Sequence, residues 1–201
     1  MSSSFSLANG VALASALIGW AALGVAFVRG SRGGVRGKAG RDGRSLAGLA
    51  VQMAGATLVW SVRRGPATPL VGDPGSPFEV VVPLLAAALV VAAVWLSWGA
   101  FRALGAQWSL EARVLSDHQL VTIGPYKYVR HPIYAAVWAL LLATGLALSR
   151  WPALAAGAAL YGAGTLLRIR SEEALLRGRL HEAYDVYAAR IPALVPRPWA
   201  R

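Results

Sequence analysis

Residues 133–167 read IYAAVWALLLATGLALSRWPALAAGAALYGAGTLL, and Arg150 is the only charged residue among them. One helix of 35 residues would be about 52 Å long, whereas the hydrocarbon core of a bilayer is about 30 Å thick. Arg150-Trp151-Pro152, in the middle of the stretch, is typical of a turn that starts a new helix. The stretch therefore predicts two spans of 17 residues, Ile133–Ser149 and Trp151–Leu167, joined by a tight hairpin.

Three further uncharged runs precede this hairpin, at Met1–Val28, Leu46–Val62 and Val80–Phe101. The chain of 201 residues is 56% hydrophobic and 14% charged, against roughly 25% charged residues in globular proteins. Runs of this length fit a bilayer, so the composition excludes a soluble enzyme, a disordered chain and a collagen-like chain. We predict an all-α polytopic membrane protein with five transmembrane helices and a cytosolic amphipathic C-terminal helix.

The spans are expected to form one integral membrane domain over residues 1–201. Residues 1–101 supply the first three spans, and residues 102–201 supply the last two spans and the tail. The first loop, the third loop and the tail hold 17 of the 20 Lys and Arg residues, and the intervening segments hold three. The positive-inside rule therefore predicts an outer amino terminus and a cytosolic tail. The formal net charge of +11 is explained by anionic membrane lipids and requires no nucleic acid.

Polar side chains concentrate in two inner segments, residues 102–131 and the tail from Arg168 onward. The chain has no cysteine, and its three histidines show no spacing typical of metal ligands, so a catalytic metal is not expected. No G-x-G-x-x-G loop is present, and Gly162-Ala-Gly164 lies inside a span, where small residues serve helix packing. We therefore expect a metal-free site where the two polar segments meet the membrane.

Arg130 and His131 lie at the predicted start of the fourth helix, because Pro132 suits its first position. The positive end of the helix dipole, Arg130 and Lys127 would together attract an anion. Two simpler interpretations stay open at this point. The basic residues could contact lipid phosphates at the membrane surface, and His131 could serve only as a cap or a packing residue.

The tail is predicted to form an amphipathic helix when its residues are placed at 100° per residue. Leu176, Leu180, Tyr184, Tyr187 and Ile191 then share one stripe with Glu173, and Glu172 lies at its edge. A carboxylate on a buried face needs a functional reason. In the alternative interpretation, Glu173 pairs with Arg177 on a solvated helix face.

Five motifs in this half of the chain resemble the isoprenylcysteine carboxyl methyltransferase family and the related phospholipid methyltransferases. They read GAQWS at 105–109, DHQLVTIGPYKYVRHPIY at 117–134, EExxL at 172–176, YxxY at 184–187 and RIPxLVP at 190–196. The resemblance indicates a bacterial member and extends over nearly half the chain. The Phe-Gly pair that usually precedes the two tyrosines is replaced here by Leu180 and His181.

The resemblance implies methyl transfer from S-adenosylmethionine to a lipophilic acceptor that arrives from the membrane, with the carboxylate of an isoprenylcysteine-like molecule favoured. It implies that Arg130 and Glu173 are catalytic, Arg130 as the cation that orients an acceptor carboxylate. An amine or thiol acceptor would need a base, for which Glu173 or His118 would be candidates. The implied cofactor-binding residues are His118, Leu120, Gly124, Tyr126, His131, Pro132, Tyr134, Glu172, Glu173, Tyr184 and Tyr187.

Two other classes of protein remain open from the sequence. One is a membrane-embedded NADPH-dependent reductase of the sterol-reductase type, and the other is a non-catalytic membrane scaffold. The acceptor and the oligomeric state are not encoded in any feature of the sequence. We expect the protein in a bacterial inner membrane, in contact with membrane lipids.

Overall fold

The structure is a computed structural model that describes residues 7–31, 43–65, 68, 70, 76–105 and 120–196. Its helices are α1 (Leu7–Ser31), α2 (Gly43–Ser61), α3 (Phe78–Leu104), α4 (Pro132–Leu148), α5 (Trp151–Leu180) and α6 (Glu182–Arg190), with a short 3₁₀ helix, η2 (Gly124–Lys127). The described residues contain no β-strand beyond an isolated bridge between Arg63 and Ser149. The predicted all-α class is therefore confirmed.

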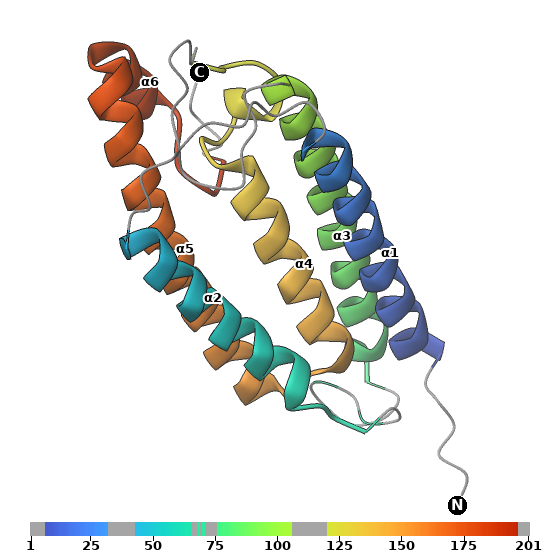
Figure 1. Cartoon of the computed structure of the whole chain (residues 1–201). Helices are drawn as coiled ribbons and strands as arrows, with labels where there is room; N and C mark the ends of the chain where they lie inside the picture. The colour runs from blue at the N-terminus through green and yellow to red at the C-terminus, as the bar shows by residue number, and fades with distance from the viewer. Residues whose placement is uncertain are drawn as a thin grey trace, which may run out of the picture.

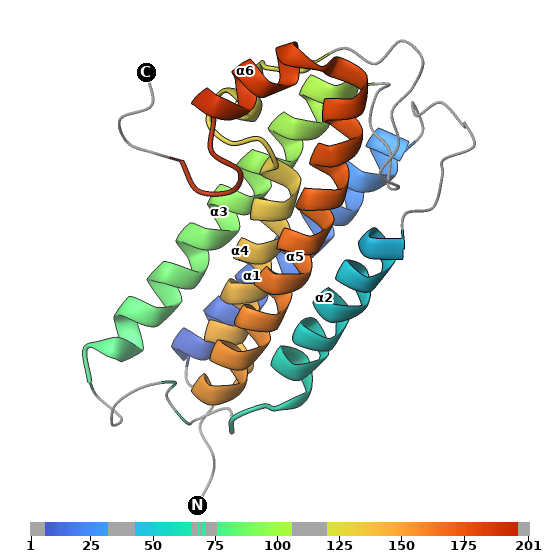
Figure 2. The ribbon, with the colours of Figure 1, turned by 90° about the vertical axis from the view of Figure 1, so that its left-hand side faces the viewer.

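Each of the five predicted spans coincides with one helix, and α1 to α5 run alongside one another as a bundle (Figures 1 and 2). α1 begins at the end of the bundle opposite to α6 (Figure 1). Gly10–Arg29 and Phe78–Leu104 are long and apolar enough to cross a membrane, and Pro132–Leu148 is a shorter apolar helix. The protein is therefore an integral membrane protein, and the count of five spans stays a prediction.

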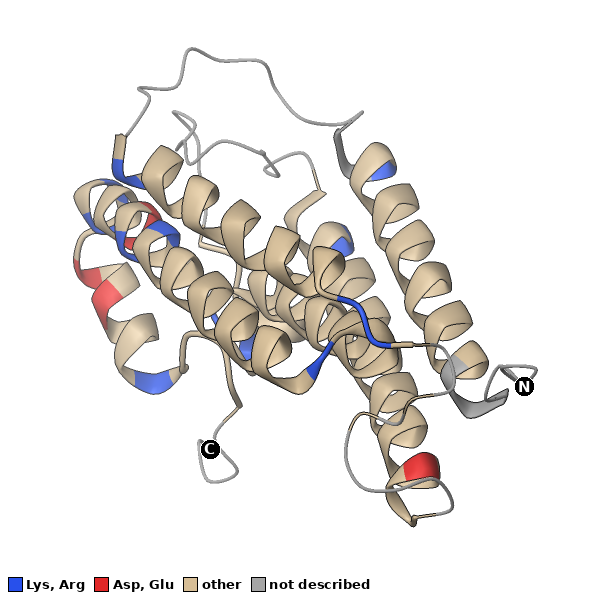
Figure 3. Ribbon diagram, turned by 90° about the horizontal axis from the view of Figure 1, so that it is seen from below, with Lys and Arg blue, Asp and Glu red and all other residues tan. Residues whose placement is uncertain are grey.

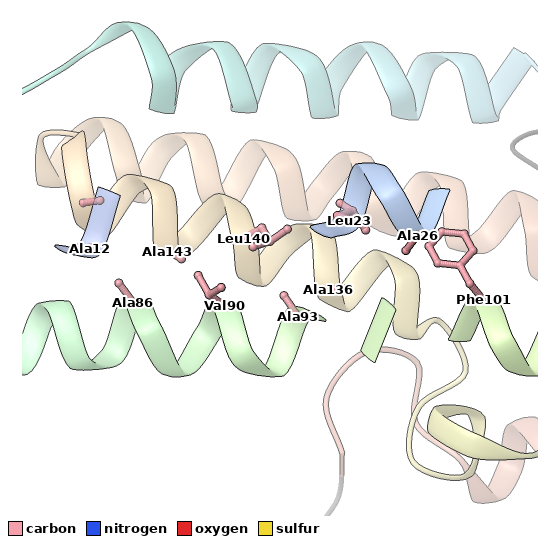
Figure 4. Close-up of a cluster of buried hydrophobic side chains, with 11 residues drawn as sticks. Ala12, Leu23, Ala26, Ala86, Val90, Ala93, Phe101, Ala136, Leu140 and Ala143 are labelled. Atoms are coloured by element: carbon pink, nitrogen blue, oxygen red, sulfur yellow. The ribbon is translucent and has the colours of Figure 1, made fainter. Parts of the chain in front are cut away.

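α4 lies at the centre of the bundle, in contact with α1, α2, α3 and α5. Small side chains line much of its contact with α1 and α3, so the backbones approach closely, as is usual between helices in membranes (Figure 4). Larger side chains fill the remaining space between the three helices. This cluster consists of Ala12, Leu23, Ala26, Ala86, Val90, Ala93, Phe101, Ala136, Leu140, Ala143 and Ala147.

α2 packs on α5 through pairs of glycines that recur seven residues apart. A Cβ added at Gly48 would lie 2.8 Å from the carbonyl oxygen of Gly164, and one at Gly55 would lie 2.6 Å from that of Gly157. Side chains cannot be accommodated at these distances, so backbone touches backbone along the two helices. The expectation that Gly164 serves helix packing is confirmed.

The predicted hairpin is present, because α4 ends at Leu148 and α5 begins at Trp151. Arg64, which follows α2, caps the end of α4: its Nη1 donates to the carbonyl of Ser149, and its Nη2 donates to those of Leu146 and Ala147, over 2.7–2.9 Å. Helix ends leave carbonyl groups without intrahelical partners, and a guanidinium satisfies several at once. This contact fixes α2, α4 and α5 at the end of the bundle remote from α6.

The tail differs from the prediction of one amphipathic helix. α5 continues from the membrane segment without interruption to Leu180, and α6 begins after a break at His181. His181 has φ 47° and ψ −129°, a conformation that glycine adopts readily and other residues rarely do. The 100° spacing is therefore valid only as far as Leu180, and the angles assigned to Tyr184, Tyr187 and Ile191 were wrong.

Candidate active site at the junction of α4, α5 and α6

Among the described residues, most Asp and Glu residues lie around α5 and α6, at one end of the bundle, beside several Lys and Arg residues (Figure 3). Four of the five acidic residues that the structure describes lie there, and the fifth, Glu79, is at the start of α3. The acidic residues at this end are Glu172, Glu173, Glu182 and Asp185. Acidic side chains are costly in an apolar bundle, so the end at which they gather is the candidate functional site.

Arg130 and His131 immediately precede α4, with Pro132 at its first position, as the sequence predicts. The segment after α6 returns to this point. The backbone amide of Arg130 donates to the carbonyl of Pro192 over 2.9 Å, and that of His131 donates to the carbonyl of Ala193 over 3.0 Å. The start of α4 is thus joined to the end of the tail by main-chain hydrogen bonds.

Glu173, on α5, is the centre of an ion cluster and is only 6% exposed. Its Oε1 accepts from Arg130 Nε at 2.9 Å and pairs with Arg130 Nη2 at 2.8 Å. The same oxygen lies 3.2 Å from His131 Nε2, and Oε2 accepts from Arg177 Nη2 at 3.2 Å. Burial raises the pKa of the Glu173 carboxyl, but hydrogen bonds from His131 and Arg130 outweigh it and lower that pKa to about 2.

His131 lies between the two glutamates of α5. Its Nδ1 is 3.6 Å from Glu172 Oε2, and its Nε2 faces Glu173. Burial lowers the pKa of the imidazole, but the two carboxylates outweigh burial, so the pKa is raised. The pKa of Glu172 is lowered, because the positive charge of His131 outweighs the burial that raises it. The two glutamates and His131 therefore favour their charged forms together.

Aromatic side chains surround the ion cluster. The ring of Tyr134 lies 5.8 Å from that of His131, and the ring of Tyr187 lies 6.1 Å from that of Tyr184. Tyr187 also donates its hydroxyl to the carbonyl of Tyr126 over 2.8 Å, which joins α6 to η2. Such rings can contact a cation or a planar base on their faces.

Two polar atoms of the cluster are buried without a hydrogen-bond partner among the described residues: Glu172 Oε2 and the hydroxyl of Tyr184. Burial and, after it, the charge of Glu173 raise the pKa of Tyr184, so its hydroxyl stays protonated and can donate. Buried polar atoms without partners are rare and call for an explanation. A bound polar ligand would supply the missing partners.

The structure thus brings together most residues that the sequence assigns to the site, from η2, α4, α5 and α6. Gly124, with φ 60°, instead faces Gly99 and Ala103 of α3, where it forms the turn into η2. Leu120 lies at the start of that segment, partly buried. His118 lies outside the described residues. The residues brought together are Tyr126, Arg130, His131, Pro132, Tyr134, Glu172, Glu173, Tyr184 and Tyr187.

The sequence predicted no role in the site for Arg168. It predicted Arg177 only in the alternative interpretation, as the partner of Glu173 on a solvated helix face. Both arginines lie one helical turn from a glutamate, at i,i+4 spacing, which is the signal that could have identified them. Arg177 does pair with Glu173, as the alternative interpretation states, but within a cluster that also contains Arg130 and His131.

No group of three or more His, Asp or Glu side chains that could hold a metal ion occurs among the residues that the structure describes. No curated protein matches the chain. Residues 85–178, from α3 to near the end of α5, match the isoprenylcysteine carboxyl methyltransferase (ICMT) family. The matched region contains Arg130, His131 and both glutamates of the ion cluster, and it implies membrane methyltransferase activity. Through these residues, just under half of the chain is similar to the isoprenylcysteine carboxyl methyltransferase family.

Proposed function

We propose that this protein transfers a methyl group from S-adenosylmethionine to a lipophilic acceptor, with the carboxylate of an isoprenylcysteine-like molecule favoured. The observation that carries the proposal is the ion cluster of α4 and α5, in which Glu172 Oε2 pairs with His131 Nδ1 at 3.6 Å but is buried without a hydrogen-bond partner among the described residues. When bound, S-adenosylmethionine would supply the methyl group on its sulfonium: an acceptor carboxylate oxygen would bond to the methyl carbon as the carbon–sulfur bond breaks, giving a methyl ester and S-adenosylhomocysteine as the leaving group. The alternative of a nicotinamide-dependent reductase is not favoured by the family match.

The residues present fit this cofactor. Glu172 Oε2 needs a donor, which an amine or a ribose hydroxyl supplies, and the Tyr184 hydroxyl can donate to a ring nitrogen or an oxygen. The rings of Tyr134 and Tyr187 suit a sulfonium or an adenine. The positive end of the α4 dipole favours the cofactor's carboxylate. The side chains themselves would align the reactants and exclude water.

The protonation states of the cluster favour a carboxylate acceptor over an amine or a thiol. The pKa of Glu173 is about 2, so its carboxylate is a poor proton acceptor. The pKa of His131 is raised, so its imidazole already holds a proton in the lower part of the neutral range. A carboxylate needs no base to accept a methyl group, whereas a protonated amine does. We therefore assign Glu173 the role of counter-ion to Arg130 and His131.

A lipophilic acceptor has a place to bind in a groove of about 660 Å³ between α1 and α2, with α4 and α5 beneath it. Val137, which lines the groove, lies one helical turn from Tyr134, and Tyr161 lies two turns from Arg168. The groove would therefore hold an apolar chain whose polar end reaches the ion cluster. Its apolar lining comprises Trp20, Met53, Ala56, Trp60, Val137 and Tyr161.

Filling the groove should discriminate against long acceptors. Ala56→Trp places a large ring in the groove and is expected to raise KM for a long-chain acceptor about tenfold, the effect of about 1.4 kcal/mol of lost binding. KM for a truncated acceptor and the affinity for S-adenosylhomocysteine should change little. Ala54→Trp, at an exposed position of the same helix outside the groove, is the control. Equal KM changes in the two variants would exclude the groove as the acceptor site.

We further propose five spans in a bacterial inner membrane, with an outer amino terminus and the α5–α6 junction in the cytosol. The uneven distribution of Lys and Arg supports this orientation. Tags placed at the two ends should show opposite accessibility in intact cells. Detection of both tags from the same side would contradict the five-span arrangement.

The proposed reaction can be tested with purified protein and S-adenosylmethionine labelled in its methyl group. Prenylated cysteines, fatty acids, thiols and phospholipid amines are offered as acceptors. The expected product is soluble in organic solvent and releases its label in alkali, because methyl esters hydrolyse there and methylated amines and thioethers do not. A label that resists alkali would redirect the proposal to an amine or a thiol.

A further inference from the structure

Gln52 is a buried amide in the middle of α2, only 2% exposed, in the half of the chain that precedes the matched residues 85–178. Its Nε2 donates to Thr165 Oγ1 over 2.8 Å, and its Oε1 accepts from Arg168 Nη1 over 3.2 Å. A polar group inside a membrane helix is costly unless it is hydrogen-bonded, and it usually has a functional reason. Both partners of Gln52 lie on α5, and one of them leads to the ion cluster.

The close approach of α2 and α5 fixes the position of this amide. A Cβ added at Gly164 would lie 2.7 Å from the backbone nitrogen of Gln52 and 2.8 Å from its Cγ. Because Gly164 has no side chain, the side chain of Gln52 can lie against the α5 backbone. Thr165 Oγ1, which itself donates to the carbonyl of Tyr161, then holds the amide by its nitrogen.

Arg168 connects this contact to the proposed active site. Its guanidinium carbon lies 5.2 Å from the centroid of the Tyr134 ring, within the range of a cation–π interaction. Arg168 lies one helical turn before Glu172. Burial raises the pKa of Glu172, whereas His131, Tyr134 and then the charge of Arg168 lower it. Arg168 Nε is buried without a hydrogen-bond partner among the described residues, so the group is held by the bond from Nη1 to Gln52 and by the contact with Tyr134.

We propose that Gln52 is a positioning residue for methyl transfer, which holds Arg168 across Tyr134, one helical turn from Glu172. Gln52 itself does not reach the ion cluster and acts only through Arg168. The expected effect on kcat/KM rests on the proposed function. The hydrogen bond between Gln52 and Arg168 does not depend on that function. It also gives α2, which precedes the matched residues, a role in the reaction.

Gln52→Leu removes the acceptor for Arg168 while keeping a buried side chain of similar length. We expect kcat/KM for the acceptor to fall on the order of tenfold, because a displaced contact misaligns the reactants. Gln52→Glu keeps an acceptor for Arg168 and should restore most of that loss. Trp98→Phe, which removes the bond from Trp98 Nε1 to the carbonyl of Ala22 between α3 and α1, is the matched control for loss of an interhelical bond. It should not lower kcat/KM.

A double-mutant cycle with Arg168→Gln separates positioning from packing. If Gln52 acts through Arg168, Gln52→Leu should have little further effect on kcat/KM in the Arg168→Gln background. Independent, multiplicative losses would overturn the proposal. The proposal would also be overturned if Gln52→Glu did not recover the kcat/KM lost in Gln52→Leu and if that loss were explained by a lower melting temperature alone.

A readout without turnover keeps this test separate from the proposed function. Labelling by an arginine-selective glyoxal, followed by mass spectrometry, reports how firmly Arg168 is held. Its labelling should increase severalfold in Gln52→Leu and stay at the wild-type level in Trp98→Phe. Unchanged labelling in Gln52→Leu would refute the positioning role. A wild-type protein that transfers no methyl group, with this labelling pattern intact, would instead refute the proposed function.

Discussion

Glu173→Gln is expected to lower both the stability of the protein and its affinity for the cofactor. Glu173 is 6% exposed and balances Arg130, His131 and Arg177. A neutral amide leaves the mostly buried Arg130 without its counter-ion and removes one of the two carboxylates beside His131, which costs about 3 kcal/mol or more. Because these ion pairs stabilise the folded protein, a loss of stability is expected together with the loss of affinity.

Thermal unfolding in detergent and titration with S-adenosylhomocysteine measure the two effects of Glu173→Gln. We expect a clearly lower melting temperature and at least a tenfold weaker affinity, as for the loss of one hydrogen bond to a charged group. Glu182→Gln changes an exposed carboxylate of α6 and should behave as wild type. If Glu173→Gln had the melting temperature and the S-adenosylhomocysteine affinity of the wild type, Glu173 would not be the centre of the cluster.

Arg130→Lys is expected to lose cofactor affinity and turnover together. The guanidinium Nη1 donates to the carbonyls of Ala188 and Ile191, while Nε and Nη2 contact Glu173. Each nitrogen therefore meets a protein acceptor, and the group holds α5 to the end of α6. Lysine keeps the charge but cannot form this fork. We therefore propose that Arg130 organises the site, in place of the acceptor-orienting role that the family resemblance implies.

The loss of turnover in Arg130→Lys should be on the order of tenfold or more, the effect of misplacing one contact in a site. Affinity for S-adenosylhomocysteine should fall by a similar factor, and trypsin should cleave the α6 region faster. Lys127→Gln, at an exposed position in η2, is the control and should leave all three unchanged. A loss of turnover with unchanged cofactor affinity would return Arg130 to the role of orienting the acceptor carboxylate.

The membrane bundle could be predicted because its signals are local. The uncharged run around Arg150 exceeds the thickness of a bilayer and contains a turn sequence, so the hairpin between α4 and α5 follows from length alone. Pro132 likewise fixed the start of α4. The burial of Glu173 also followed from its place on α5, where the 100° spacing is valid.

The tail could not be predicted in the same way, because a single backbone conformation redirects it. The break occurs at His181, where φ is positive, and not at Gly178, which lies within α5. The family resemblance contained the relevant signal, since a glycine usually stands where His181 stands here. Without that break, Tyr184 and Tyr187 would not fold back toward Glu173 and Tyr126, and the contacts that close the site would be missing.

Contacts between segments that are distant in the chain could not be predicted from the sequence either. The acceptors of Arg130 at Ala188 and Ile191 are backbone carbonyls, which any residue provides, so no side-chain pattern identifies them. The bond between Gln52 and Arg168 joins helices whose register depends on Gly48 and Gly164. Both arrangements arise from packing of the whole bundle.

Titration of the detergent-solubilised protein with S-adenosylhomocysteine, and separately with NADPH, tests the central claim most directly. A cluster built for S-adenosylmethionine should bind S-adenosylhomocysteine saturably at one site, and Glu172→Gln should weaken that binding less than Glu173→Gln does. NADPH should not bind. Binding of NADPH without S-adenosylhomocysteine would support a reductase, and binding of neither molecule would indicate a non-catalytic scaffold, so either result would contradict the account.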